Sequence, residues 1–136
     1  MVPDFDRISA GFLVKDRKVL IAQRDEKQKQ PLKWEFPGGK LKEEEQYDEA
    51  LIREFKEEMD LNVEVIKEIG GAEVNLKNKV FIVLFFLIDG DINQIKLKNH
   101  KEYKFVTLNE LKNIDLSDAD KSFINKYEEE LKEYIN

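Results

Sequence analysis

The chain has 136 residues, and its 29 acidic side chains outnumber its 23 basic ones, so the formal net charge is −6. This balance argues against a broad electrostatic grip on DNA or RNA. The absence of cysteine excludes a disulfide framework or a zinc–thiolate site. His100 is the single histidine, which excludes a metal triad built from histidines.

No signal-peptide pattern opens the sequence, and the longest apolar run, residues 80–88, is too short to span a bilayer. Internal repeats, linkers and low-complexity tracts are also missing from the sequence. We therefore expect one soluble, cytoplasmic domain over residues 1–136, present as a monomer or a homodimer. We expect neither a membrane nor a nucleic acid as a direct partner.

The N-terminal part of the chain predicts a β-hairpin, a polar loop and a turn. Short β-type runs cover residues 8–14 and 19–23, and the polar loop covers residues 25–33. The sequence Trp34-Glu35-Phe36 then leads into Pro37-Gly38-Gly39. We expect a turn there that requires the backbone freedom of glycine.

The next segment has the pattern of an amphipathic helix from about Gln46 to Met59. Asp48 and Glu49 fall in its first turn, where the helix dipole favours negative charge. The expected apolar stripe consists of Leu51, Ile52, Phe55 and Met59.

Three further strands and a helix are predicted after this segment. The strands cover residues 63–72, with a break at Gly70-Gly71, residues 79–88 and residues 104–107. The apolar run 79–88 is expected to be a central strand that is buried on both faces. Ser117 is placed to cap a helix from Asp118 to about Tyr134. This order of elements predicts helices on both sides of a mixed sheet.

Three glutamates of the first helix stand at positions i, i+3 and i+4, namely Glu54, Glu57 and Glu58. They project within an arc of roughly a quarter turn, and like charges at this spacing repel unless a cation lies among them. Glutamates on a helix usually form a solvated face. Here, however, the Glu54 and Glu58 edge borders the apolar stripe, and an arginine and a Gly-Gly turn stand at fixed spacing from it. Carboxylate oxygens suit Mg²⁺, so the pattern favours a metal site.

The segment that contains these glutamates resembles the Nudix box, G-x5-E-x7-R-E-U-x-E-E-x-G-U, where U is an apolar residue. The matching residues are Gly39, Glu45, Arg53, Glu54, Phe55, Glu57, Glu58 and Leu61. Asp60 stands where the pattern has its second glycine. We expect Asp60 to close the helix in the left-handed conformation, at a modest cost in stability. The resemblance implies an α/β (α+β) fold, the Nudix-type α/β/α sandwich with a mixed β-sheet and a loop–helix–loop box.

The Nudix resemblance also implies roles for individual residues. Glu54, Glu57 and Glu58 would bind the essential Mg²⁺, for which Mn²⁺ can substitute, and Gly39, Glu45 and Glu102 join them as further metal-site residues. Arg53 is expected to orient the carboxylates through a bidentate pair. The general base is expected to be a carboxylate or a metal-bound hydroxide, and the candidate carboxylates are one of the box glutamates and Glu102. The alternative for Glu102 is a plain exposed loop position.

Residues 21–40 and the sequence LSDAD at 116–120 extend the resemblance to MutT-type nucleotide pyrophosphohydrolases. In that group the residues matching Arg24 and Phe36 line a nucleotide pocket, and Asp120, or Asp118 nearby, faces a base edge. Helix-dipole stabilisation is the alternative role for both aspartates. The full set of expected substrate-binding residues is Arg24, Phe36, Gly38, Gly39, Lys40, Asp118 and Asp120.

The function implied by this resemblance is Mg²⁺-dependent hydrolysis of a (deoxy)nucleoside triphosphate to the monophosphate and pyrophosphate. Its purpose would be to remove oxidised or surplus nucleotides. Two alternatives remain from the sequence: hydrolysis of another nucleoside diphosphate derivative, and a non-catalytic nucleotide sensor with the same fold. The three intact box glutamates favour an enzyme over a sensor.

Overall fold

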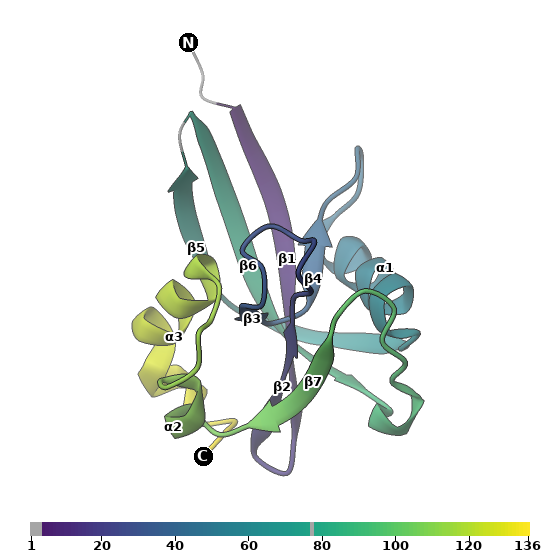
Figure 1. Cartoon of the computed structure of the whole chain (residues 1–136), viewed down its shortest axis with the longest axis vertical. Coiled ribbons are helices and arrows are strands. Elements are labelled where there is room, and N and C mark those ends of the chain that lie inside the picture. The colour runs from purple at the N-terminus through teal and green to yellow at the C-terminus, as the bar shows by residue number, and fades with distance from the viewer. Residues whose placement is uncertain (1–3, 77) are drawn as a thin grey trace.

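The computed structural model describes residues 4–76 and 78–136, and a mixed β-sheet forms its centre (Figure 1). The sheet order is β3-β2-β1-β6-β5, with β4 paired to β1 and β7 paired to β2. Strands β1 and β6 are parallel, whereas the other pairs are antiparallel. The strands are β1 (Asp4–Lys15), β2 (Lys18–Gln23), β3 (Trp34–Glu35), β4 (Gly38–Lys40), β5 (Val63–Leu76), β6 (Lys79–Gly90) and β7 (Glu102–Val106).

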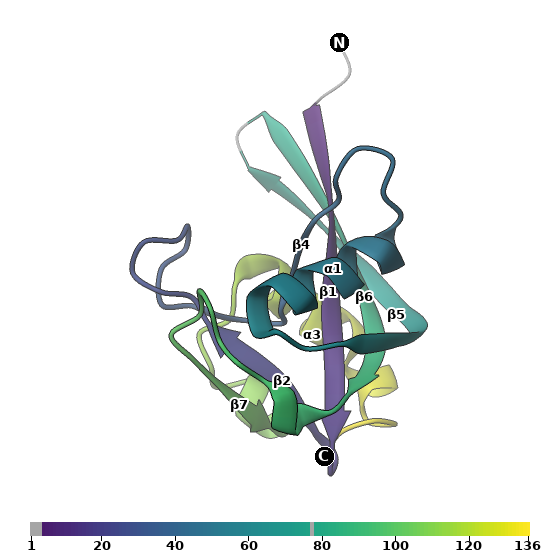
Figure 2. The ribbon, with the colours of Figure 1, turned by 90° about the vertical axis from the view of Figure 1, so that its right-hand side faces the viewer.

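Two long helices cover opposite faces of this sheet. Helix α1 (Tyr47–Met59) lies in front of the sheet in Figure 2 and α3 (Asp118–Leu131) lies behind it. Each helix buries its own apolar cluster against the strands, around Phe55 on one side and Phe123 on the other. The short helix α2 (Leu108–Leu111) and the 3₁₀ turn η1 (Ile92–Gln94) complete the fold. The predicted α/β/α sandwich with a mixed sheet is therefore confirmed.

Helix α1 begins and ends close to the predicted residues, for identifiable reasons. The Gln46 backbone N–H donates to the Glu49 carboxylate at 2.9 Å, which satisfies one of the free amides at the helix start. Asp60 ends the helix with a φ of 53°, the predicted left-handed conformation. The expected apolar stripe is wrong at Ile52, which is 43% exposed because it faces away from the sheet that buries Leu51.

The Pro37-Gly38-Gly39 segment requires glycine for a different reason from the one predicted. No glycine among the described residues has a positive φ, so the expected turn that depends on backbone freedom is wrong. Residues 38–40 instead form β4 against β1, and a Cβ on Gly38 would lie 1.9 Å from the Ser9 carbonyl oxygen. Glycine is needed because the two backbones approach too closely for any side chain.

Strands β5 and β6 differ from their predictions in continuity and in burial. The break expected at Gly70-Gly71 is wrong, since β5 continues to Leu76 with register shifts at Val65/Lys67 and Glu68/Gly70. Strand β6 is central, between β1 and β5, as predicted. Only its second half is well buried, because the first half, with β1 and β5, extends beyond the two helices (Figure 1). None of the helices in the described ranges is long and apolar enough to cross a membrane.

Candidate functional site

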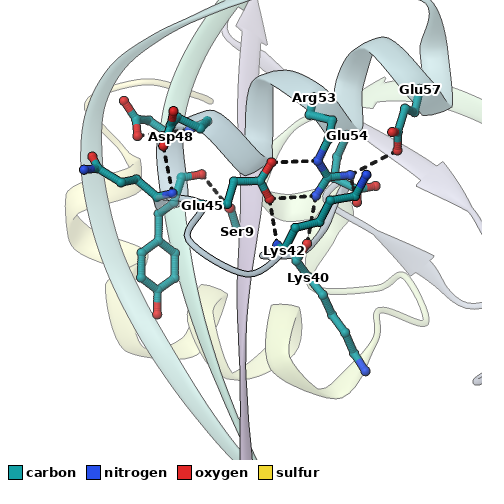
Figure 3. A network of polar contacts seen from close by, with 11 residues as sticks. Ser9, Lys40, Lys42, Glu45, Asp48, Arg53, Glu54 and Glu57 are labelled. Atoms are coloured by element: carbon teal, nitrogen blue, oxygen red, sulfur yellow. Dashed lines mark hydrogen bonds and ion pairs between the residues drawn. The ribbon is translucent and has the colours of Figure 1, made fainter.

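Arg53 is the centre of a polar network that joins the loop before α1 to the helix itself (Figure 3). Its Nε and Nη2 donate to the two carboxylate oxygens of Glu45 at 2.7 and 2.9 Å. Its Nη1 donates to Glu54 at 2.8 Å and to Glu57 at 3.1 Å, and Nη2 also donates to the Lys40 carbonyl at 3.0 Å. These five bonds use all five donors of the guanidinium, so Arg53 fixes three carboxylates and one loop carbonyl relative to each other.

Glu45 differs from Glu54 and Glu58 in the direction in which its pKa is shifted. The hydrogen bonds from Arg53 lower the pKa of Glu45 to about 2, so this carboxylate stays ionised. Its Oε1 also accepts the Lys42 backbone N–H at 2.8 Å, which closes the loop onto the helix. Glu45 is therefore placed to anchor the loop.

Gly39 lies directly against the carboxylate of Glu54. A Cβ added at Gly39 would stand 2.4 Å from the Glu54 Cδ and 2.6 Å from its Oε1. Strand β4 and helix α1 can approach this closely only because position 39 has no side chain. The structure thus brings together Gly39, Glu45, Arg53 and Glu54, which are spread over the predicted box.

Glu58 is the most unusual carboxyl group of the site. Burial, followed by the charges of Glu35, Glu54 and Glu57, raises the pKa of Glu58 to about 9. Its Oε2 is buried and has no hydrogen-bond partner among residues 4–76 and 78–136. Burial likewise raises the pKa of Glu54. Buried polar atoms are normally paired, so an unpaired carboxylate oxygen among other acids indicates a position for a cation.

The donor set therefore fits a hard divalent ion such as Mg²⁺, which prefers carboxylate oxygens. Glu54, Glu57 and Glu58 are the residues that would hold it. Within the described ranges, no three carboxylate or imidazole groups already surround a single point as metal ligands. The carboxylates of Glu54 and Glu57 instead accept hydrogen bonds from Arg53. To bind the ion, each of these carboxylates would have to contact both Arg53 and the ion.

Glu35, which the sequence analysis did not select, belongs to this acidic region. Its side chain is 14% exposed, and its oxygens contact Arg24 Nη2 at 2.7 Å and His100 Nε2 at 2.8 Å. Its charge contributes to the raised pKa values of Glu58 and Asp120. A charged residue between Trp34 and Phe36 in a short strand is the sequence signal that would have found it, because charges are rarely buried without a partner.

The expected substrate pocket residues Arg24, Phe36 and Asp120 lie around Glu35. Arg24 donates to Glu35 through Nε at 2.8 Å, and buried Asp120 accepts the Phe36 backbone N–H at 2.8 Å. The Phe36 ring is 3% exposed and packs on Phe12 with 5.3 Å between ring centroids. The ring is thus part of the core, and only the backbone of Phe36 is directed at Asp120.

Three expected site residues lie apart from the network. Glu102 is exposed at the start of β7, opposite Gln23, and no hydrogen bond or ion pair connects it to the box within the described ranges. The Lys40 ammonium pairs with Asp6 at 2.8 Å and not with a box carboxylate. The exposed Asp118 carboxylate lies 3.6 Å from the Lys33 ammonium.

Asp120 predicts a pH-dependent stability. Burial, with the charge of Glu35, raises its pKa to about 7 from an ordinary value of 3.8. The folded chain therefore holds this proton more tightly than the unfolded chain. The stability from this group is complete below about pH 4 and is lost as the pH rises through about 7, by on the order of 4 kcal/mol.

The substitution Asp120→Asn isolates this contribution, because an amide oxygen can still accept the Phe36 N–H. We expect urea unfolding to show that the variant gains stability relative to the parent between pH 5 and pH 8. Asp118→Asn, at an exposed position in the same helical turn, should show no such trend. A constant difference between Asp120→Asn and the parent at both pH values would contradict this assignment.

Comparisons with known proteins agree with this fold. The chain matches the NUDIX domain over residues 6–127. The 8-oxo-dGTP diphosphatase of Proteus vulgaris is 34% identical over 92 residues, which cover 67% of this chain and 82% of that protein. The CTP pyrophosphohydrolase of Escherichia coli K12 is 30% identical over 73 residues, which cover 54% of each protein. The crystal structure of the MutT protein from Methanosarcina mazei Go1 superposes with a TM-score of 0.83 at 24% identity, over 96% of this chain and 97% of that one.

The chain therefore belongs to the Nudix family. It is an enzyme of that family, a Nudix hydrolase.

Proposed function

We propose that this enzyme hydrolyses a (deoxy)nucleoside triphosphate to the monophosphate and pyrophosphate in a Mg²⁺-dependent reaction. The observation that carries the proposal is the group of carboxylates around Arg53, with a buried Glu58 oxygen that has no partner. The Proteus relative is an 8-oxo-dGTP diphosphatase and the Escherichia relative a CTP pyrophosphohydrolase, and both support this substrate class. The enzyme would act as one domain in the cytoplasm and remove oxidised or surplus nucleotides, a task that belongs to DNA repair.

The reaction needs a water molecule in line with a phosphorus atom and compensation of the charge on the phosphoryl oxygens. Mg²⁺, held by Glu54, Glu57 and Glu58, would supply positive charge and polarise these oxygens, and Mn²⁺ could replace it. Arg53 keeps two of these carboxylates in place. A carboxylate accepts the proton of the attacking water, and both a box glutamate and Glu102 remain candidates for this base.

The nucleotide would lie between the acidic helix edge and the Arg24 side of the sheet. Arg24 and Asp120 offer a donor and an acceptor there. The backbone at Gly39 passes close to Glu54, and Gly38 precedes it in β4. Lys40 is an exposed cation next to this loop, available to a phosphate once it leaves Asp6. Phe36 would contribute through its backbone, and Asp118 through an exposed carboxylate at the start of α3.

Two other functions use the same site. Another nucleoside diphosphate derivative could be the substrate in place of the triphosphate. The ion held by these carboxylates would contact only the diphosphate part of either molecule. A non-catalytic nucleotide sensor would keep the pocket and not turn over. The intact carboxylate set favours hydrolysis over sensing.

An assay of pyrophosphate against phosphate release tests this proposal. The panel contains ordinary dNTPs, 8-oxo-purine dNTPs and 5-substituted pyrimidine dNTPs, each with Mg²⁺ and with chelator. We expect pyrophosphate release that the chelator abolishes and that favours one base. Well-folded protein that releases pyrophosphate from none of these substrates would contradict the proposed reaction and favour the other two functions.

A further inference from the structure

Glu35 connects segments that are far apart in the chain but meet at the site. It lies in β3, opposite Ala22 of β2, and its side chain is largely buried. Oε1 accepts from Arg24 Nε at 2.8 Å, and Oε2 lies 2.8 Å from His100 Nε2. Each oxygen therefore engages a side chain from a different segment.

Arg24 is held from two sides before any substrate arrives. Glu35 binds Nε and Nη2, while the Lys29 carbonyl accepts from Nη1 at 2.7 Å. Three of the five guanidinium N–H groups are occupied in this way, which leaves two for a ligand. A guanidinium that is already oriented loses less conformational freedom when it binds a substrate.

His100 belongs to a segment, residues 96–101, that crosses from the end of α1 to β2. Its side chain is 1% exposed, so the contact with Glu35 is shielded from water. The same segment continues into Glu102 at the start of β7. Its backbone contacts are Lys96 N to Met59 O at 2.8 Å, Lys98 N to Glu58 O at 3.1 Å and Lys101 N to Gln23 O at 2.9 Å.

The charge on Glu35 is unfavourable for the neighbouring buried acid Asp120, whose pKa it helps to raise. A neutral residue at position 35 would remove this repulsion. A buried charge lowers the stability of the fold unless its contacts compensate for its desolvation. The Glu35 carboxylate instead serves to bind both Arg24 and His100.

We propose that Glu35 is a positioning residue, which orients Arg24 toward the substrate and fastens the 96–101 segment to β3 beside the box. This proposal rests on the proposed function, because the substrate is taken to be a nucleoside triphosphate. Glu35 acts through Arg24 and His100 and does not itself touch the reacting atoms.

The kinetic test compares Glu35→Gln with Glu26→Gln. Glu26 pairs with Lys101 of the same segment at 3.0 Å but is exposed, which makes it a matched control. We expect Glu35→Gln to raise the KM for the triphosphate about tenfold or more and to lower kcat less, because Arg24 loses its orientation. In an Arg24→Lys background the same substitution should add less than threefold, since the two residues act as a unit. Glu26→Gln should leave both constants unchanged.

A spectroscopic test uses the fact that His100 is the single histidine, so its imidazole gives one set of NMR signals. The probe is the dGTP analogue with a methylene group between the α and β phosphorus atoms, added with Mg²⁺. We expect its binding to shift the His100 signals in the parent and in Glu26→Gln, but not in Glu35→Gln. The reason is that Glu35 is the contact through which Arg24 and His100 are connected.

The two readouts separate this proposal from the proposed reaction. If the parent hydrolyses no triphosphate but its His100 signals respond to the analogue through Glu35, the reaction is refuted and the positioning role stands. Parental KM, kcat and His100 response in Glu35→Gln would overturn the positioning role. If Glu35→Gln does not fold, Glu35→Asp, which keeps the charge but is one methylene shorter, is expected to show the same rise in KM, and an unchanged KM would refute the role.

Discussion

The substitution Glu57→Gln is expected to lower turnover about 10³-fold or more without disturbing the fold, which corresponds to at least 4 kcal/mol of transition-state stabilisation. Glu57 is one of the three proposed metal ligands, and an amide lacks the negative charge that a divalent ion requires. Its side chain is 53% exposed and makes one contact with Arg53 at 3.1 Å. The amide oxygen can keep that contact, so the free energy of unfolding should change by less than about 0.5 kcal/mol.

Steady-state kinetics at saturating Mg²⁺ and urea unfolding measure the two halves of this prediction. Glu129→Gln is the matched control, because Glu129 is an exposed helical glutamate with one ion pair, to Lys132 at 2.9 Å. It should retain parental turnover and stability. Parental turnover in folded Glu57→Gln would refute the assignment of Glu57 as a metal ligand.

Arg53→Lys is expected to reduce both activity and stability. Lysine keeps the positive charge but cannot offer five donors in a planar fork, so Glu45, Glu54 and Glu57 lose their common partner. We expect turnover to fall about 10²-fold because the carboxylates are no longer held in position. The free energy of unfolding should fall by about 2 kcal/mol, as expected for lost charge-assisted hydrogen bonds in a partly buried site.

Arg17→Lys separates these two effects, because Arg17 is a comparable multiple donor far from the site. Its guanidinium binds the C-terminal end of the chain, including the Asn136 side chain at 2.8 Å and the Lys132 carbonyl at 2.8 Å. This variant should lose stability while each folded molecule keeps its turnover. If Arg53→Lys behaved in the same way, the arginine would be a structural residue and its role in orienting the carboxylates would be refuted.

The local part of the site was predictable from the sequence because its contacts are short in sequence. The spacing of Arg53, Glu54 and Glu57 places the three on adjacent helix positions, and the structure joins them by hydrogen bonds. The left-handed ending at Asp60 followed from the glycine that the pattern has at this position. Helix bounds followed from hydrophobic periodicity, and the mixed sheet with helices on both sides followed from the order of the elements.

Only the tertiary structure decided which distant residues join the box. The contact between Glu35 and His100 spans 65 positions, and that between Phe36 and Asp120 spans 84. No periodicity links such residues, because their separation depends on how β3 lies against β2 and where α3 packs. The structure also gave a different reason for Gly38, which is required by the close approach of β1 and not by a turn.

The sequence by itself thus determined the fold class, through the order of its elements, and the carboxylate helix with its arginine, through spacing within one or two helical turns. The tertiary structure decided which charged side chains lie next to each other in places from which water is excluded. It brought the half-buried Glu58 close to the charge of Glu35, raised the pKa of both Glu58 and Asp120, and directed the Phe36 side chain into the core. The physical reason is that burial and charge proximity are properties of packed surfaces, which form only when segments from the whole chain meet.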